Sequence, residues 1–66
     1  MYHISLHHDA FGVEGAEFFD GTISQAKRKA TNMRRLAGHG WRAVIRTEHG
    51  DPVAVRYPGA KEWRIV

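Results

Sequence analysis

The sequence predicts an α+β domain, in which an antiparallel sheet of four to five strands carries a single helix packed on one face, in the order β(β)αβββ. One stretch, residues 22–41, has the apolar spacing of an amphipathic helix. One segment before it and three after it alternate apolar and polar residues, as half-buried strands do. The last three segments are joined by short turns, which favours an antiparallel meander. One helix can cover only one face, so the other face is expected to be open.

The chain begins with a predicted strand, Tyr2–His8, whose residues alternate in YHISLHH. Asp9–Gly15 contains two glycines and is interpreted as a turn. Ala16–Phe19 is expected to be a short second strand that completes a hairpin. The N-terminal part of the sheet therefore rests on one clear strand and one short one.

Residues Thr22 to Trp41 form the predicted helical stretch. Thr22 and Gln25 have the spacing of a capping box, and Gly38 and Gly40 supply the conformation that ends a helix. One face is expected to pack on the sheet through a stripe spaced by three and four residues: Ile23, Ala26, Ala30, Met33 and Ala37. The outer side is basic, with Arg28 and Arg35 opposite the stripe and Lys27, Lys29 and Arg34 on its flanks.

Three strands are predicted after the helix, over Trp41–Glu48, Val53–Tyr57 and Lys61–Val66. Turns at residues 49–52 and 58–59 separate them. Alternation assigns the inner layer to Ile4, Leu6, Ala43, Ile45, Val53, Val55, Trp63 and Ile65. The same alternation assigns the open face to His3, Ser5, His7, Arg42, Arg46, Arg56 and Arg64.

Length and composition predict one domain over residues 1–66, expected to be a monomer. A chain of this size buries only about 60% of its unfolded surface, so a deep enclosed pocket is not expected. There is no cysteine for disulfides or thiolate metal ligands, which favours a reducing cytoplasm. No apolar run approaches the ~20 residues of a membrane span, and no signal-peptide pattern is present.

The net charge of +3 is distributed unevenly along the chain. Residues 1–21 contain four acidic residues and no lysine or arginine, whereas residues 22–66 contain all ten basic residues and three acidic ones. The two parts therefore carry −4 and +7. A basic surface favours anionic partners, such as nucleic acid or an acidic protein.

The sequence does not predict a catalytic or metal centre. No serine or threonine lies in a nucleophile elbow or beside a spaced base, and no glycine-rich phosphate loop precedes the helix. His7 and His8 are adjacent in a strand and point to opposite faces, while His3 and His7 are about 13 Å apart along it, too far for one zinc ion. We therefore expect a protein that is not an enzyme and binds neither a metal nor a cofactor.

An open sheet also resembles the platforms of single-strand RNA modules, which stack bases on aromatic side chains. Alternation assigns Trp41, Tyr57 and Trp63 to the inner side, leaving only Phe18 or Phe19 for stacking. The sequence therefore disfavours base stacking and leaves phosphate contact open. The alternative is that cross-strand arginine–glutamate pairs keep this face soluble.

A family resemblance is carried by the helix and the strands after it. The runs Ile23–Ala30, Trp41–Glu48, the Gly50-Asp51 turn, Val53–Tyr57 and Lys61–Val66 resemble small phage anti-CRISPR proteins that act on type I surveillance complexes. The likeness covers about residues 15–66, and the histidine-rich first strand and the Gly38-His39-Gly40 corner depart from it. It implies a stoichiometric inhibitor that docks on the Cascade backbone in the cytoplasm of the host bacterial cell. It implies that Lys27, Arg28 and Lys29 contact the complex.

Three functional hypotheses follow. The first is the Cascade inhibitor, which blocks target DNA through a basic surface. The second is a small nucleic-acid-binding module, such as a phage regulator. The third is an assembly protein whose charges only keep it soluble. In the first two, the candidate contact residues are the helix and open-face cations: Lys27, Arg28, Lys29, Arg34, Arg35, Arg42, Arg46 and Arg56.

Overall fold

The computed structural model describes all of residues 1–66 and has the predicted order of elements. Five strands and one helix follow one another as β1 (Tyr2–His8), β2 (Gly12–Phe19), α1 (Ile23–Ala37), β3 (Arg42–Thr47), β4 (Pro52–Arg56) and β5 (Arg64–Ile65). The α+β class and the order ββαβββ predicted from the sequence are therefore confirmed.

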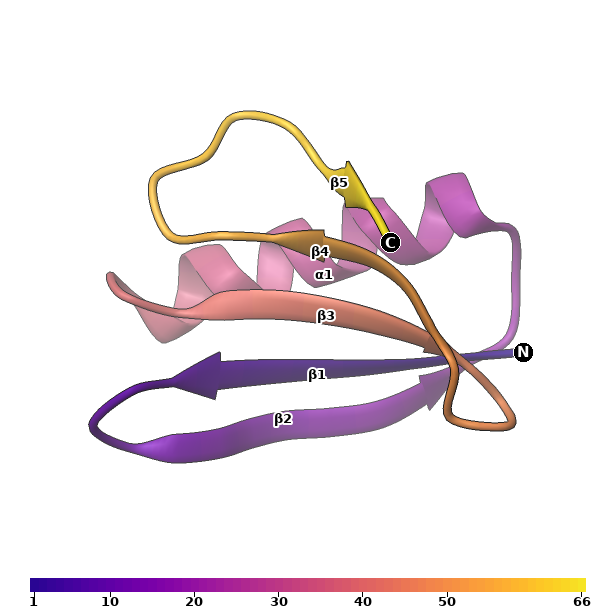
Figure 1. Ribbon diagram of the computed structural model, residues 1–66, viewed down its shortest axis with the longest axis horizontal. Helices are drawn as coiled ribbons and strands as arrows, with labels where there is room; N and C mark the ends of the chain where they lie inside the picture. Colours follow the sequence, from indigo (N-terminus) through magenta and orange to yellow (C-terminus); the bar gives the residue numbers. More distant parts are fainter.

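The five strands form one antiparallel sheet in the order β2-β1-β3-β4-β5 (Figure 1). Helix α1 connects the outer strand β2 to β3, and it packs on β1 and β3, the centre of the sheet. Figure 1 views the sheet from the side opposite the helix, which lies behind the strands. This side has no second layer, so the molecule has a covered face and an open face.

Local sequence signals set both ends of α1. The Thr22 hydroxyl accepts a hydrogen bond from the Gln25 amide at 3.2 Å, and the Gln25 side chain accepts from the Thr22 amide at 3.0 Å, which completes the capping box. At the other end, Gly38 has a φ of +104° and its amide donates to the Arg34 carbonyl. The helix therefore begins and ends where the sequence predicts.

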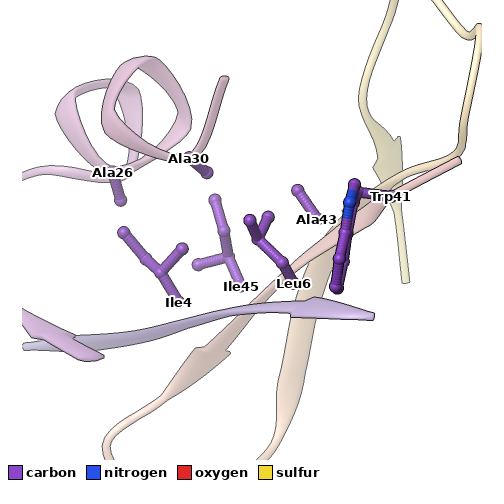
Figure 2. Close-up of a cluster of buried hydrophobic side chains, with 7 residues drawn as sticks. All are labelled: Ile4, Leu6, Ala26, Ala30, Trp41, Ala43 and Ile45. Atoms are coloured by element: carbon purple, nitrogen blue, oxygen red, sulfur yellow. The ribbon is translucent and has the colours of Figure 1, made fainter. Parts of the chain in front are cut away.

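The core lies between α1 and the centre of the sheet. Ala26 and Ala30 are fully buried and face the large side chains of β1 and β3 (Figure 2). Their small size lets the helix lie close to the strands. The buried cluster consists of Ile4, Leu6, Ala26, Ala30, Trp41, Ala43 and Ile45. One member of the predicted stripe is different: Ala37, in the last turn, is exposed.

The N-terminal hairpin has a longer second strand than predicted. Residues 12–15 belong to β2 and not to a turn, so only residues 9–11 connect the two strands. A register shift occurs between Ile4 and Leu6, where β2 has an extra residue. Gly15 lies there with a φ of +64°, and a Cβ atom at this position would come within 3.1 Å of the Met33 methyl group. The two glycines that predicted a turn instead begin the strand and form its bulge.

The facing of β4 is opposite to the prediction. Ala54 lies beside Ile45 on the helix side and is fully buried, whereas Val55 lies beside Val44 on the open side. Assigning Val53 and Val55 to the inner layer was therefore wrong. The pairing of Ala54 with buried Ile45 sets this facing, and β4 has an extra residue where the register shifts between Ile45 and Arg46.

This reversal also moves a predicted open-face residue. Arg56 pairs with Ala43 on the helix side, where its guanidinium donates to the Thr31 hydroxyl at 3.1 Å and to the Ala60 carbonyl at 2.9 Å. The placement of Arg56 on the open face was wrong. Its long side chain lets the guanidinium reach these two polar partners.

The C-terminal strand is shorter than predicted, covering only Arg64 and Ile65. Ile65 pairs with Ala54 on the helix side as expected, but its side chain is largely exposed. Trp63 is partly buried against the core cluster. The sheet thus becomes less covered towards β5.

Candidate functional site

The open face is organised in three rows that cross the sheet, as the strand register shows. One row runs through Phe18, His3, Arg46 and Pro52, and a second through Ser5, Val44, Val55 and Arg64. The third contains Val13, His7 and Arg42. The sequence assigned His3, Ser5, His7, Arg42, Arg46 and Arg64 to this face, and the structure brings all six together there.

The open face is basic and has no negative side chain in its paired rows. Both acidic residues of the strands, Glu14 and Glu17, lie beside Leu6 and Ile4 on the helix side. The structure has two ion pairs, Lys29–Glu17 and His49–Glu48, and neither uses a strand arginine. The alternative of cross-strand arginine–glutamate pairs is therefore wrong. The charges of the three open-face arginines are not compensated within the protein.

Two aromatic side chains share this face with the arginines. Phe18 is 63% exposed, and its ring lies 5.1 Å from the His3 ring. Tyr57 follows Val55 by two residues and therefore shares its side of the chain, and the Arg64 guanidinium lies 5.9 Å from its ring centre. Because β4 faces the other way, the prediction that Tyr57 points inward was wrong. The open face carries the stacking groups that the sequence had disfavoured.

The middle of the open face is buried even though no helix covers it. Ser5 is 1% exposed, because the imidazole of His7 and the guanidinium of Arg46 both reach its hydroxyl, at 2.8 and 3.1 Å. Val44 and Val55 beside it are 7% and 8% exposed. The longer cationic side chains therefore cover a small, largely apolar patch at the centre of the open face.

The Ser5–His7 contact places a hydroxyl beside a base, which the sequence did not predict. A serine nucleophile activated by histidine must also reach a substrate. Ser5 is nearly inaccessible, and its oxygen already accepts a hydrogen bond from Arg46. This geometry serves to fix the positions of His7 and Arg46, and it does not present a reactive oxygen.

The pKa of His7 is lowered, chiefly by burial and then by the charges of Arg42, Arg46 and His3. The folded protein therefore binds the His7 proton less tightly than the unfolded chain does. A lowered histidine pKa gives stability that is full above the unfolded value and is lost as the pH falls through the folded value.

We expect acidification to lower the melting temperature through His7. Between pH 7.5 and pH 5 the unfolded chain takes up this proton before the folded protein does, so the free energy of unfolding decreases. The measurement is thermal unfolding by circular dichroism across this range. His7→Gln should flatten the profile, whereas His49→Gln, at a largely exposed residue, should not. Identical profiles for wild type and His7→Gln would contradict the assignment.

The predicted contact residues of the helix differ in their availability. Lys29 forms an ion pair with Glu17 at 2.9 Å, and Arg34 donates to the Tyr57 carbonyl at 2.7 Å. Arg35 reaches only the neighbouring Asn32. Lys27 and Arg28 have no ion-pair partner. Lys29, Arg34 and Arg56 thus have partners within the protein. The cations without an ion-pair partner lie partly on the helix and partly on the open face.

Metal and membrane sites gain no support from the geometry. No group of three or more histidine, cysteine or acidic side chains lies close enough to hold a metal ion. The single helix is neither long nor apolar enough to cross a membrane.

Comparison with known proteins found no matching family model, no matching curated protein and no matching solved structure. The resemblance to anti-CRISPR proteins gains no support from these comparisons. The functional assignment therefore rests on the geometry of the open face.

Proposed function

We propose that this protein is a binding module for single-stranded nucleic acid, and that the open face of the sheet is its interface. The observation that carries the proposal is the composition of that face. It combines three arginines without acidic partners with two accessible aromatic side chains, Phe18 and Tyr57. The arginines are Arg42, Arg46 and Arg64. Arginines contact phosphates, and aromatic rings stack with bases without selecting a sequence.

The arrangement favours a single strand over a duplex. Bases can stack on side chains only where they are not already stacked and paired, which makes unpaired segments the usual targets of open sheets. Phe18 on β2 and Tyr57 at the end of β4 lie on opposite sides of Ser5 and Val44. A single strand of nucleic acid that crosses the open face would meet the ring of Phe18 towards one edge of the sheet and the ring of Tyr57 towards the other, with arginines between them.

The inhibitor of a Cascade complex is the second candidate. The observation that favours it is the helix, where Lys27 and Arg28 are free of ion-pair partners and Arg28 is exposed opposite the packed stripe. These are two of the three residues that the resemblance implies as contacts. In this proposal the helix docks on the ribonucleoprotein and the open face is not needed.

The test measures binding of the wild-type protein to fluorescein-labelled oligonucleotides of roughly ten nucleotides by anisotropy. We expect single strands to bind more tightly than the corresponding duplex. Three phosphate contacts predict that log K falls against log salt with a slope of about −2 for single strands. Absence of saturable binding to single strands at low salt, with capture of a purified Cascade complex, would replace the first proposal with the second.

A further inference from the structure

A cleft at the C-terminal end of α1 lies outside the open face. It has a volume of about 420 Å³, within the range of small-molecule sites. Three segments form it: the last turns of the helix, residues 38–41, and the turn between β4 and β5. Its lining includes the cationic side chains of Arg34 and Arg35 and the bulky Trp41, together with smaller residues, and it contains no acidic side chain.

The guanidinium groups around this cleft are held in place by neutral partners. Arg34 donates to the Tyr57 carbonyl, while Arg56, behind Thr31, donates to the Thr31 hydroxyl and the Ala60 carbonyl. These contacts fix the side chains but leave their charges uncompensated. The pKa of Arg34 is lowered, first by burial and then by the charge of Arg56. Two fixed positive groups near one another favour a bound anion between or beside them.

The cleft also offers several free hydrogen-bond donors. Each guanidinium has five N–H groups, and Arg34 and Arg35 each use one within the protein. The backbone amides of His39 and Gly40 have no partner among the internal hydrogen bonds. The C-terminal end of the helix carries roughly half a negative charge, which repels an anion. The full positive charges of Arg34 and Arg35, with Arg56 behind them, outweigh this repulsion.

We infer that this cleft binds a phosphate dianion. Phosphate matches the forked donors of arginine, which can hold two of its oxygens at once. The volume is larger than a bare phosphate needs, so a phosphate attached to a sugar-sized group also fits. The shared chemistry is a terminal phosphate, either as the free ion or on the 5′ position of a nucleotide. The inference does not depend on the open-face proposal, because none of its residues lies on that face.

The test is a titration followed by amide chemical shifts at constant ionic strength, with chloride as the reference salt. The probes are inorganic phosphate, adenosine 5′-monophosphate and adenosine. We expect saturable shifts at residues 38–41 with at least one of the two phosphate probes and none with adenosine. Saturation by inorganic phosphate identifies the free ion as sufficient, and saturation by the nucleotide alone identifies the attached group as required.

A matched pair of variants separates this cleft from general charge. Arg35→Gln removes a cleft residue that is exposed and bonds only to Asn32, so the fold should be retained. Arg28→Gln removes the same charge two turns away, outside the cleft. We expect about tenfold weaker phosphate binding for Arg35→Gln and no change for Arg28→Gln. Lack of saturation with both phosphate probes, or equal losses for both variants, would overturn the inference.

Discussion

Ala30→Asp is expected to destabilise the protein severely. Ala30 is fully buried on the side of α1 that faces the sheet, where the cluster around it contains only apolar side chains (Figure 2). A carboxylate there has no partner, and burying it costs about 3 kcal/mol or more. A domain of this size is stabilised by roughly 3–10 kcal/mol in total. The melting temperature should therefore fall by at least about 12 °C, measured by circular dichroism.

Ala37→Asp is the matched control, since Ala37 has the same helical spacing but is exposed. A carboxylate in the last turn opposes the helix dipole by only about 0.5 kcal/mol, so its melting temperature should change little. If both variants had the melting temperature of the wild type, the assignment of Ala30 to the buried face of the helix would be wrong. If both unfolded, the loss would reflect helix propensity and not burial.

The fold could be predicted from the sequence because its strongest signals are local. The capping box at Thr22 and Gln25, the alanine spacing and the glycine at position 38 specify the helix with little help from tertiary contacts. The first strand has an apolar residue at every second position on the side that becomes buried. These signals depend on residues at most four apart. Patterns of such short range can be recognised without knowing which distant residues will contact the segment.

The facing of β4 could not be predicted from alternation, because both of its faces are apolar at the centre. Alternation alone assigns Val55 to the core, yet the pairing of Ala54 with buried Ile45 decides the outcome. The register of β3 with β4 also shifts between Ile45 and Arg46, which breaks strict alternation. The one available signal was size: Ala54 matches Ala43 and the alanines of the helix.

That single reversal changes the candidate site. With Val55 turned outward, Tyr57 joins the open face and Arg56 leaves it. Phe18 depends in the same way on the length and bulge of β2, which two glycines hid in the sequence. The basic character of the open face was predictable from β1 and β3. Its aromatic character depended on contacts between strands that the sequence does not display.

Reversing two open-face charges should abolish most binding of single-stranded nucleic acid. Arg42 and Arg64 suit this test because neither makes an internal ion pair or donates a side-chain hydrogen bond, so Arg42→Glu with Arg64→Glu should leave the fold intact. Each lost charge-assisted contact is worth about 1.5 kcal/mol or more, so two weaken binding by about 100-fold or more. Removing two of three phosphate contacts should also reduce the salt slope from about −2 to about −0.7.

The control is Lys27→Glu with Arg28→Glu on the helix, which changes the net charge by the same amount. These residues lie on α1, which covers the opposite face of the sheet, so their charges act on the open face only at long range and are screened by salt. Their reversal should weaken single-strand binding by less than about threefold, since it removes no direct contact with the bound strand. Anisotropy titrations of the wild type and both double variants measure the difference directly. The opposite pattern, with the helix variant losing its partner and the sheet variant unchanged, would assign function to the helix and favour docking on a Cascade complex.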